Sequence, residues 1–286
     1  MTKAWTSIFP ELAARSRKPR TRGVTMILDK CQGPAATSDL LAMSGDYIDF
    51  WKMSYGTSAL LDDGFLRQKI ETIRQHGVIV HPGGTLAEYA IMRGVCRDYV
   101  RHTQALGFNG IEISDGTIDV PQDIRRDAIR YACDLGLTVL SEVGKKDPRE
   151  QPSPQQLAEQ ALTDFESGVS WVIVDARESG RGVGVFDEEG SVREESLDVM
   201  VDMLKDHLDH MIWETPLKKQ QEYFILRFGP HVGLGNIQPR DVLALESMRT
   251  GIRFETFRAF AEKLLREPQE ARQSEPADGK ADGRQR

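Results

Sequence analysis

Short apolar runs of the kind that form buried strands recur along the chain, separated by amphipathic stretches of helical length. Several of these runs follow a glycine, such as Gly77, Gly107, Gly136 or Gly168, where a helix can end in a left-handed cap. This alternation predicts repeated βα units around a parallel sheet. The eight expected strands are VTMIL at 24–28, YIDFWK at 47–52, VIVH at 78–81, GIEIS at 110–114, LTVLSEV at 137–143, WVIVD at 171–175, MIWE at 211–214 and VGLGNI at 232–237.

Two architectures accommodate eight βα units, a closed barrel and an open doubly wound sheet. The open sheet usually carries a glycine-rich dinucleotide turn after its first strand, and DKCQGP at 29–34 is not such a turn. The length of 286 residues suits one barrel domain, which typically takes roughly 250 residues. The sequence therefore predicts a single α/β domain, a (β/α)8 TIM barrel over 23–266, with its active site at the C-terminal ends of the strands.

The two flanking segments lack this periodic pattern. Residues 1–22 carry a basic cluster between Arg15 and Arg22, and we expect an N-terminal arm whose charge is solvated. Residues 267–286 are rich in Gln, Glu, Asp, Gly and Arg and nearly devoid of large apolar side chains. That composition predicts a disordered C-terminal tail.

Composition and charge narrow the class of protein. Apolar residues make up 40% of the chain and charged residues 28%, as in ordinary globular proteins. The net charge of -7 gives no general attraction to nucleic acid or to an anionic membrane. No apolar run reaches the roughly 18 residues of a membrane span, no signal peptide is recognisable, and three widely spaced cysteines match neither a disulfide framework nor a zinc site. We expect a cytoplasmic protein without nucleic-acid or membrane partners.

Polar residues follow nearly every expected strand, and in a barrel the strand C-termini converge on one mouth. Four carboxylates at these ends, Glu112, Glu142, Asp175 and Glu214, are hard oxygen ligands of the kind that suits Mg2+. The alternative is that they only neutralise nearby basic groups. The polar residues at the strand ends are Asp29, Lys30, Lys52, His81, Glu112, Ser114, Asp115, Glu142, Lys145, Lys146, Asp175, Arg177, Glu178, Glu214 and Asn236.

Basic groups at the same mouth could bind a phosphate or a sulfonate. A lysine squeezed between cations could also have a lowered pKa suited to proton transfer, and Lys145 and Lys146 are the leading pair. HPGGT at 81–85 could offer backbone N–H groups to an anion or only connect a strand to a helix. RESGRGVG at 177–184 could close over a phosphate or be a surface loop. We do not expect His81 to be the catalytic base.

Six blocks of the sequence resemble phosphosulfolactate synthase, in order from about Gly23 to Phe257. A further resemblance links the chain to plant heat-stress-associated proteins of about this size, which are not understood as sulfite-adding enzymes. The six blocks are DYIDFWKMSYGTSAL at 46–60, HPGGTLAEYA at 81–90, IEISDG at 111–116, SEVGKK at 141–146, RESGRGVGVFD at 177–187 and KKQQEYFILRFGPHVGLGNI at 218–237.

The resemblance implies a Mg2+-dependent lyase that adds sulfite to C3 of phosphoenolpyruvate and forms (2R)-phospho-3-sulfolactate, the entry to coenzyme M and to other sulfonates. It also implies a homo-oligomer, with a trimer as one option. The implied catalytic residues are Lys146, Lys145 and Glu142. The metal candidates are Glu112, Asp115, Glu142, Asp175 and Glu214. The candidates for binding substrate are Lys30, Lys52, His81, Ser114, Arg177, Arg181 and Asn236.

Three departures from the family pattern lie at strand ends. Cys31 and Gln32 stand after Lys30 where the family tends to carry Gly, and Ala176 follows Asp175 where the family tends to carry Glu-Gly. A threonine also follows Glu214 where alanine is expected. These differences leave open a paralogue that adds another nucleophile to phosphoenolpyruvate or to a related enol phosphate. A non-catalytic, stress-related barrel is the remaining alternative.

Overall fold

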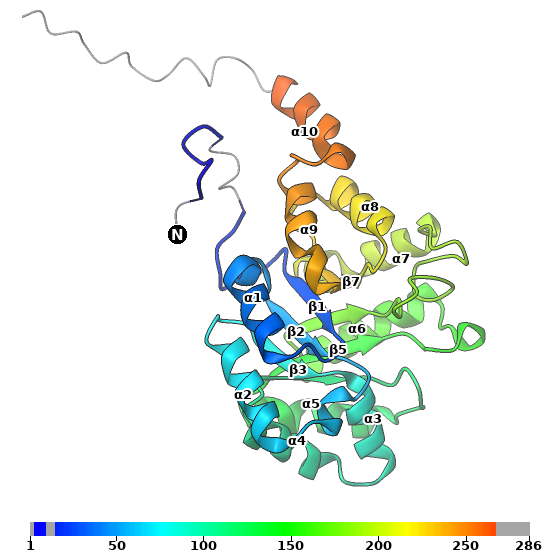
Figure 1. Cartoon of the computed structure of the whole chain (residues 1–286). Coiled ribbons are helices and arrows are strands. Elements are labelled where there is room, and N and C mark those ends of the chain that lie inside the picture. Colours follow the sequence, from blue (N-terminus) through cyan, green and yellow to red (C-terminus); the bar gives the residue numbers. More distant parts are fainter. Residues whose placement is uncertain (1–2, 10–14, 267–286) are drawn as a thin grey trace, which may run out of the picture.

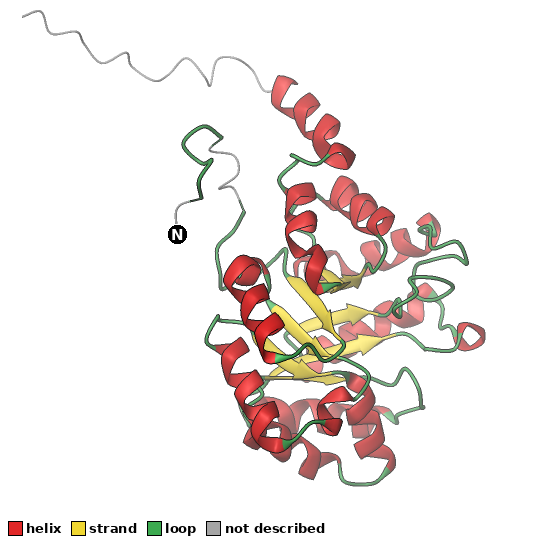
Figure 2. Ribbon diagram, viewed as in Figure 1, coloured by secondary structure: helices red, strands yellow, loops and turns green. Residues whose placement is uncertain are grey.

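The computed structural model describes residues 3–9 and 15–266, in which eight parallel strands form a nearly closed barrel surrounded by helices (Figures 1 and 2). Around the barrel the strands follow the order β3-β2-β1-β8-β7-β6-β5-β4. This arrangement confirms the predicted (β/α)8 fold. The strands are β1 Thr25–Asp29, β2 Phe50–Met53, β3 Ile79–Pro82, β4 Gly110–Ile113, β5 Thr138–Val143, β6 Trp171–Val174, β7 Met211–Glu214 and β8 Leu234–Ile237.

Helices connect the strands and cover the outside of the barrel (Figure 2). Within the described ranges, no helix has the length and apolar composition required to cross a bilayer. The predicted C-terminal tail, 267–286, lies outside the described residues. The helices are α1 Pro34–Ser44, α2 Asp63–Arg74, α3 Gly84–Met92, α4 Cys96–Leu106, α5 Gln122–Asp134, α6 Pro154–Ser167, α7 Glu194–Leu204, α8 Lys218–Phe228, α9 Val242–Arg249 and α10 Phe254–Arg266.

The expected strand over 47–52 begins later than predicted. Gly45–Tyr47 form a 3-10 turn after α1, and β2 starts only at Phe50. The apolar pattern misplaces this boundary because Ile48 N–H still donates to the Gly45 carbonyl at 3.2 Å, so the chain is turning where its side chains are already buried. The strand expected over 232–237 likewise starts at Leu234.

A side chain completes the barrel between β3 and β4, which lie beside each other without a regular ladder. Asn109 Oδ1 accepts from Val80 N–H at 2.8 Å, and Asn109 Nδ2 donates to the Val78 carbonyl at 3.3 Å. Glycine is needed next to it, because a Cβ at Gly110 would lie 2.6 Å from Ile79 Cγ2. The seam is therefore closed by an amide that imitates a strand backbone.

Alternation along the strands explains why the mouth is charged. An apolar layer fills the barrel interior, with Val24, Met26, Phe50, Leu140, Trp171, Ile173 and Ile212 as members. Because successive side chains of a strand point to opposite faces, the residue two positions further on faces inward again, nearer the C-terminal mouth. On four strands that next residue is charged. The pairs are Phe50 and Lys52, Leu140 and Glu142, Ile173 and Asp175, and Ile212 and Glu214.

The described part of the N-terminal arm is bound to the barrel rather than surrounded by water. Arg15 pairs with Glu246 at 2.9 Å and Arg20 pairs with Asp49 at 2.9 Å, and all four side chains are largely buried. The expectation that the charge of the arm is solvated is therefore wrong for these arginines. Each guanidinium meets a carboxylate at the N-terminal end of the barrel, which composition alone does not indicate.

Candidate active site

A cavity of about 670 Å3 opens at the C-terminal end of the barrel. Its floor is the charged inward layer of the strands, and its rim is formed by the loops that follow them. Most of the residues predicted for the mouth lie here. The lining consists of Leu28, Lys52, Ser54, Tyr55, Gly83, Gly84, Thr85, Glu112, Thr117, Glu142, Lys146, Asp175, Arg177, Glu178, Ser179, Glu214 and Asn236.

Lys52 on β2 is the centre of the buried charges. Its Nζ lies 3.0 Å from Glu112 Oε1, 2.8 Å from Glu142 Oε2 and 3.2 Å from Glu214 Oε1. Burial alone would lower the pKa of Lys52, but the three carboxylates outweigh it and raise the pKa well above its ordinary value. Lys52 is therefore a fixed ammonium that holds acids from three strands together.

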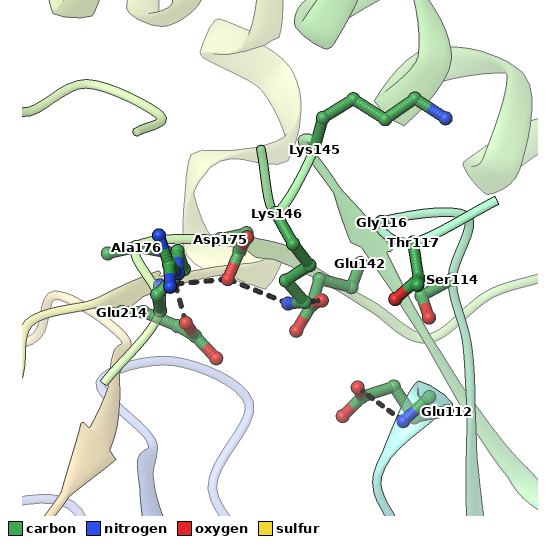
Figure 3. Close-up of polar contacts among 12 residues, drawn as sticks. Glu112, Ser114, Gly116, Thr117, Glu142, Lys145, Lys146, Asp175, Ala176 and Glu214 are labelled. Carbon is green, nitrogen blue, oxygen red and sulfur yellow. Dashed lines mark hydrogen bonds and ion pairs between the residues drawn. The ribbon is translucent and has the colours of Figure 1, made fainter. Parts of the chain in front are cut away.

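Lys146, just beyond β5, points into the same cavity (Figure 3). Its Nζ lies 2.5 Å from Glu142 Oε1 and 2.9 Å from Asp175 Oδ1. Burial opposes the charged form, yet these carboxylates raise the pKa of Lys146 above its ordinary value. The expectation of a lysine with a lowered pKa is wrong, because the neighbours are anions and not cations. Lys146 is a protonated donor.

The neighbouring acids have divergent pKa values. Burial raises the pKa of Glu112 to about 7 and that of Glu214 to about 8, and the charge of Glu142 adds to both effects. Burial acts in the same direction on Glu142, but Lys146 and Lys52 overcome it and lower its pKa below the ordinary value. Glu142, between the two ammonium groups, is thus the carboxylate that most firmly keeps its charge.

Glu142, Asp175 and Glu214 could hold a metal ion, since one oxygen of each lies within 4.8 Å of the others and all three residues are buried. Among the described residues this is the one such group. Glu112 Oε2 and Asp175 Oδ2 are buried without a hydrogen-bond partner. Four ionised carboxylates against the ammonium groups of Lys52 and Lys146 would leave two excess negative charges. The donor set and its charge therefore fit a divalent cation with hard oxygen ligands.

Asp115 does not join this group. Its Oδ1 accepts from Arg125 at 3.2 Å and its Oδ2 lies 3.4 Å from Lys145 Nζ. Lys145 in turn points away from the cavity (Figure 3), where it donates to the Asp115 carbonyl at 2.7 Å and to Asp119 at 2.9 Å. The sequence pairs Lys145 with Lys146, but the chain beyond β5 directs them to opposite sides.

The HPGGT turn binds a carboxylate of the protein itself. Gly84 N–H, at the start of α3, donates to Glu112 Oε1 at 2.8 Å, while Gly83 N–H donates to the Met53 carbonyl at 3.0 Å. A Cβ at Gly84 would lie 2.2 Å from Ser114 Oγ, so the turn needs glycine there. Two amides expected to be available for a ligand anion are therefore already used.

His81 and Ser114 lie outside the cavity lining. His81 is fully buried, and burial together with the charge of Lys52 lowers its pKa to about 3, so its ring is neutral. Its Nδ1 lies 3.2 Å from the Pro82 carbonyl. Ser114 donates to Glu88 Oε1 at 2.5 Å. Both residues are placed to support the site and do not reach its open space.

The rim of the cavity carries a second set of charges. Lys30 pairs with Glu178, and Tyr55 Oη donates to Glu178 Oε2 at 2.8 Å. Arg177 lines the cavity, and its carbonyl accepts from Asn236 Nδ2 at 3.1 Å. Of the candidates for binding substrate, Arg177 and Asn236 line the cavity, whereas Lys30 lies outside its lining and is connected to it through Glu178.

Only the first residues of the RESGRGVG loop reach the cavity; Arg181 does not line it. Gln220 Nε2 donates to the Gly180 carbonyl at 2.7 Å, and Gly184 N–H donates to Gln151 Oε1 at 3.0 Å. A Cβ at Gly184 would lie 2.3 Å from the Asp175 carbonyl oxygen. The second half of the loop is thus packed against the barrel, and its glycines serve this close packing.

Several lining residues were not among the site residues predicted from sequence. Tyr55, Thr117 and Ser179 each lie in the loop that follows a strand, beyond its first polar residue. The sequence signal that identifies them is a polar residue within the first few positions of the loop after a strand. Of the two departures nearest the acids, Ala176 uses only its backbone, whose N–H donates to Glu214 Oε2 at 3.0 Å, and the buried hydroxyl of Thr215 has no hydrogen-bond partner among the described residues. The structure explains neither substitution.

The family model of (2R)-phospho-3-sulfolactate synthase (ComA) matches residues 13–255. Phosphosulfolactate synthase of Methanothermobacter thermautotrophicus is 42% identical over 244 residues, which cover 85% of this chain and 94% of the relative. The phosphosulfolactate synthase of Bacillus subtilis is 36% identical over 251 residues, covering 86% and 97%. These matches confirm the resemblance carried by the six sequence blocks.

Two other proteins show a more distant similarity to the chain. Protein HEAT-STRESS-ASSOCIATED 32 of Arabidopsis thaliana is 25% identical over 276 residues, covering 86% of this chain and 91% of the relative. Among solved structures, an HpcH/HpaI aldolase from Desulfitobacterium hafniense DCB-2 has a TM-score of 0.50 at 11% identity, covering 91% of this chain and 97% of that chain. At this identity the structural likeness concerns the fold alone.

Proposed function

The chain belongs to the (2R)-phospho-3-sulfolactate synthase family, and we propose that it is a Mg2+-dependent enzyme that adds sulfite to C3 of phosphoenolpyruvate. The product would be (2R)-phospho-3-sulfolactate. The observation that carries the proposal is the position of Lys146, a protonated ammonium at the cavity floor between Glu142 and Asp175. Such a group can deliver the proton that the addition requires.

The proposed addition conserves the phosphate ester. A lone pair on the sulfur of sulfite forms the C–S bond at C3, and the π electrons between C2 and C3 move toward C2 and the substrate carboxylate. Lys146 then gives its proton to C2. Its raised pKa is compatible with this step, because the electron-rich C2 formed by the attack is far more basic than an amine.

The charge balance of the cavity calls for an additional cation. If all were ionised, the four inner carboxylates around Lys52 and Lys146 would leave two excess negative charges, whereas both proposed substrates are anions. Glu142, Asp175 and Glu214 would hold Mg2+. When bound, the ion supplies positive charge to the substrate carboxylate, on which negative charge accumulates during the attack.

The remaining residues act through position and charge. Lys52 draws Glu112, Glu142 and Glu214 together and fixes their distances before the substrate arrives. Glu142 accepts from Lys52 and from Lys146, so it orients the proton donor.

A cytoplasmic location and assembly into a homo-oligomer also belong to this proposal. Size-exclusion chromatography with light scattering tests the assembly.

Incubation of the purified protein with phosphoenolpyruvate and sulfite, followed by 31P NMR and mass spectrometry, tests the proposal. We expect a new phosphate ester that forms with Mg2+ and is lost when a chelator replaces the metal. If phosphoenolpyruvate stabilises the protein against heat but sulfite yields no adduct, a different nucleophile is the substrate. If neither the adduct nor the stabilisation appears, the proposed function is wrong.

A further inference from the structure

The rim of the cavity contains an unusual concentration of strained backbone. Cys31, Tyr55, Arg177 and Asn236 have φ values of 82°, 58°, 56° and 54°, and no other non-glycine residue in the described ranges has a positive φ. They lie in the loops after β1, β2 and β6 and in β8. Such conformations persist only where the surrounding structure holds them, and they cluster at ligand sites.

Glu178 joins three of these loops. Its carboxylate pairs with Lys30 from the loop after β1 and accepts from Tyr55 Oη, from the loop after β2, at 2.8 Å. The side chains of Lys30 and Glu178 are 45% and 48% exposed. An ion pair with this much exposure contributes little to stability. A second anion that enters the mouth can therefore replace the Glu178 carboxylate at small cost.

The cations deeper in the cavity are less available to a second anion. Lys52 is surrounded by three carboxylates and Lys146 by two. Arg177, by contrast, forms no ion pair with any residue that the structure describes, and the ion pair of Lys30 is with Glu178. The positive charge that is open to a ligand at this mouth thus belongs to Arg177 and, once Glu178 moves, to Lys30.

The backbone of the exposed residue Arg177 is fixed from both sides. Its N–H donates to Asp175 Oδ1 at 2.9 Å, and its carbonyl accepts from Asn236 Nδ2 at 3.1 Å. The left-handed backbone of Arg177 is therefore tied directly to one of the acids of the cavity floor. A ligand bound by this arginine would lie next to the inner group of charges, because both line the same cavity.

We propose that Lys30, Tyr55 and Arg177 form an outer subsite for an oxyanion, and that the Glu178 carboxylate occupies this subsite as an internal anion until the substrate displaces it. The ligand is a phosphoryl group or a sulfite ion. The inference rests on the proposed function, because that reaction brings two anions to one cavity. Glu178 is then a residue that sets substrate affinity without taking part in bond formation.

Replacement of the internal anion tests this inference. In Glu178→Gln we expect the KM of one substrate to fall about 2- to 5-fold, while kcat changes less than about 2-fold, because a competing charge of modest strength has been removed. The substrate whose KM falls identifies the occupant as the phosphoryl group or as sulfite. Glu189→Gln is the matched control, since Glu189 is exposed on the same connection and does not line the cavity. A KM that rises in Glu178→Gln, or stays equal to the control for both substrates, overturns the inference.

A second comparison distinguishes an anion subsite from an ion pair between Lys30 and Glu178 that only connects two loops. Lys30→Met should weaken binding more in the Glu178→Gln background than in the wild type, because only in that background is the ammonium free for the ligand. Equal effects in the two backgrounds would contradict the proposal.

Binding without turnover keeps the test independent of the reaction. Inorganic phosphate and sulfite, each added alone, should protect Glu178→Gln against heat at lower concentration than they protect the wild type. This holds even if no adduct forms in the wild type, so a failure of the proposed function does not hide the result. Identical protection of wild type, Glu178→Gln and Glu189→Gln would reject the subsite.

Discussion

The two ends of the barrel use buried charge differently. At the N-terminal end, Arg15 and Arg20 pair with Glu246 and Asp49, and each arginine also donates to a backbone carbonyl at 2.8 Å. At the C-terminal mouth, carboxylates outnumber cations, and four of them gather around the ammonium groups of Lys52 and Lys146. The first arrangement ties chain segments together, whereas the second leaves charge that a ligand can neutralise. This contrast separates charges that stabilise the fold from charges that are placed to meet a ligand.

The largest effect should come from the proposed proton donor at the mouth, Lys146. Lys146→Ala should lower kcat by roughly 10²- to 10⁴-fold, the range typical of a positioned general acid. The rate of adduct formation at saturating substrate measures it. Lys145→Ala is the matched control, because that neighbour points away from the cavity and contacts Asp115 and Asp119. Comparable losses in the two variants would contradict the assignment of the proton transfer to Lys146.

A substitution at the opposite end should affect stability and leave chemistry unchanged. Glu246→Gln removes the carboxylate facing the buried Arg15, and loss of one partner of a buried pair costs about 3 kcal/mol. Urea denaturation gives the free energy of unfolding. The exposed Asp127, paired with Arg97, provides Asp127→Asn as a control with little expected change. A drop in kcat of the folded Glu246→Gln protein would contradict the view that this end of the barrel serves stability alone.

The fold and the location of the site could be predicted from the sequence because both depend on local patterns. The period-two alternation that buries Ile173 and Ile212 also turns Asp175 and Glu214 inward, so polar residues at strand ends converge in any such barrel. The start of β2 at Phe50 could not be located, since burial of side chains continues through the preceding turn.

Roles within the site depended on contacts that no spacing encodes. Adjacent residues such as Lys145 and Lys146 diverge because a single backbone step after β5 reverses the side-chain direction. The HPGGT turn has the geometry of an anion site, yet its anion is Glu112, 28 positions away. Long-range partners also explain why the arm at Arg15 is buried.

Metal binding should stabilise the folded protein through the mouth alone, which would strengthen the contrast between the two ends of the barrel. If Mg2+ is present at about 100 times its Kd, the folded state gains about 2.7 kcal/mol, which for a chain of this size raises Tm by several degrees. Differential scanning fluorimetry with and without Mg2+ measures the shift. Asp175→Asn should abolish most of it, and Asp49→Asn at the other end should not. An unchanged shift in Asp175→Asn would place the ion elsewhere.

The smallest effect concerns the excess negative charge in the metal-free protein. The pKa of Glu214 is raised to about 8 from an ordinary 4.5, so between these values the folded state holds a proton that the unfolded state has released. Stability must then fall as pH rises through this window. Glu214→Gln removes this contribution, and in the presence of a chelator it should gain stability over the wild type as pH goes from about 6.5 to 8, by about 1 to 2 kcal/mol. Urea unfolding of both proteins at the two pH values decides the matter. A difference that does not change with pH would mean that the mouth carries no unbalanced charge without its ligand, and the distinction between the two ends would then rest on geometry alone.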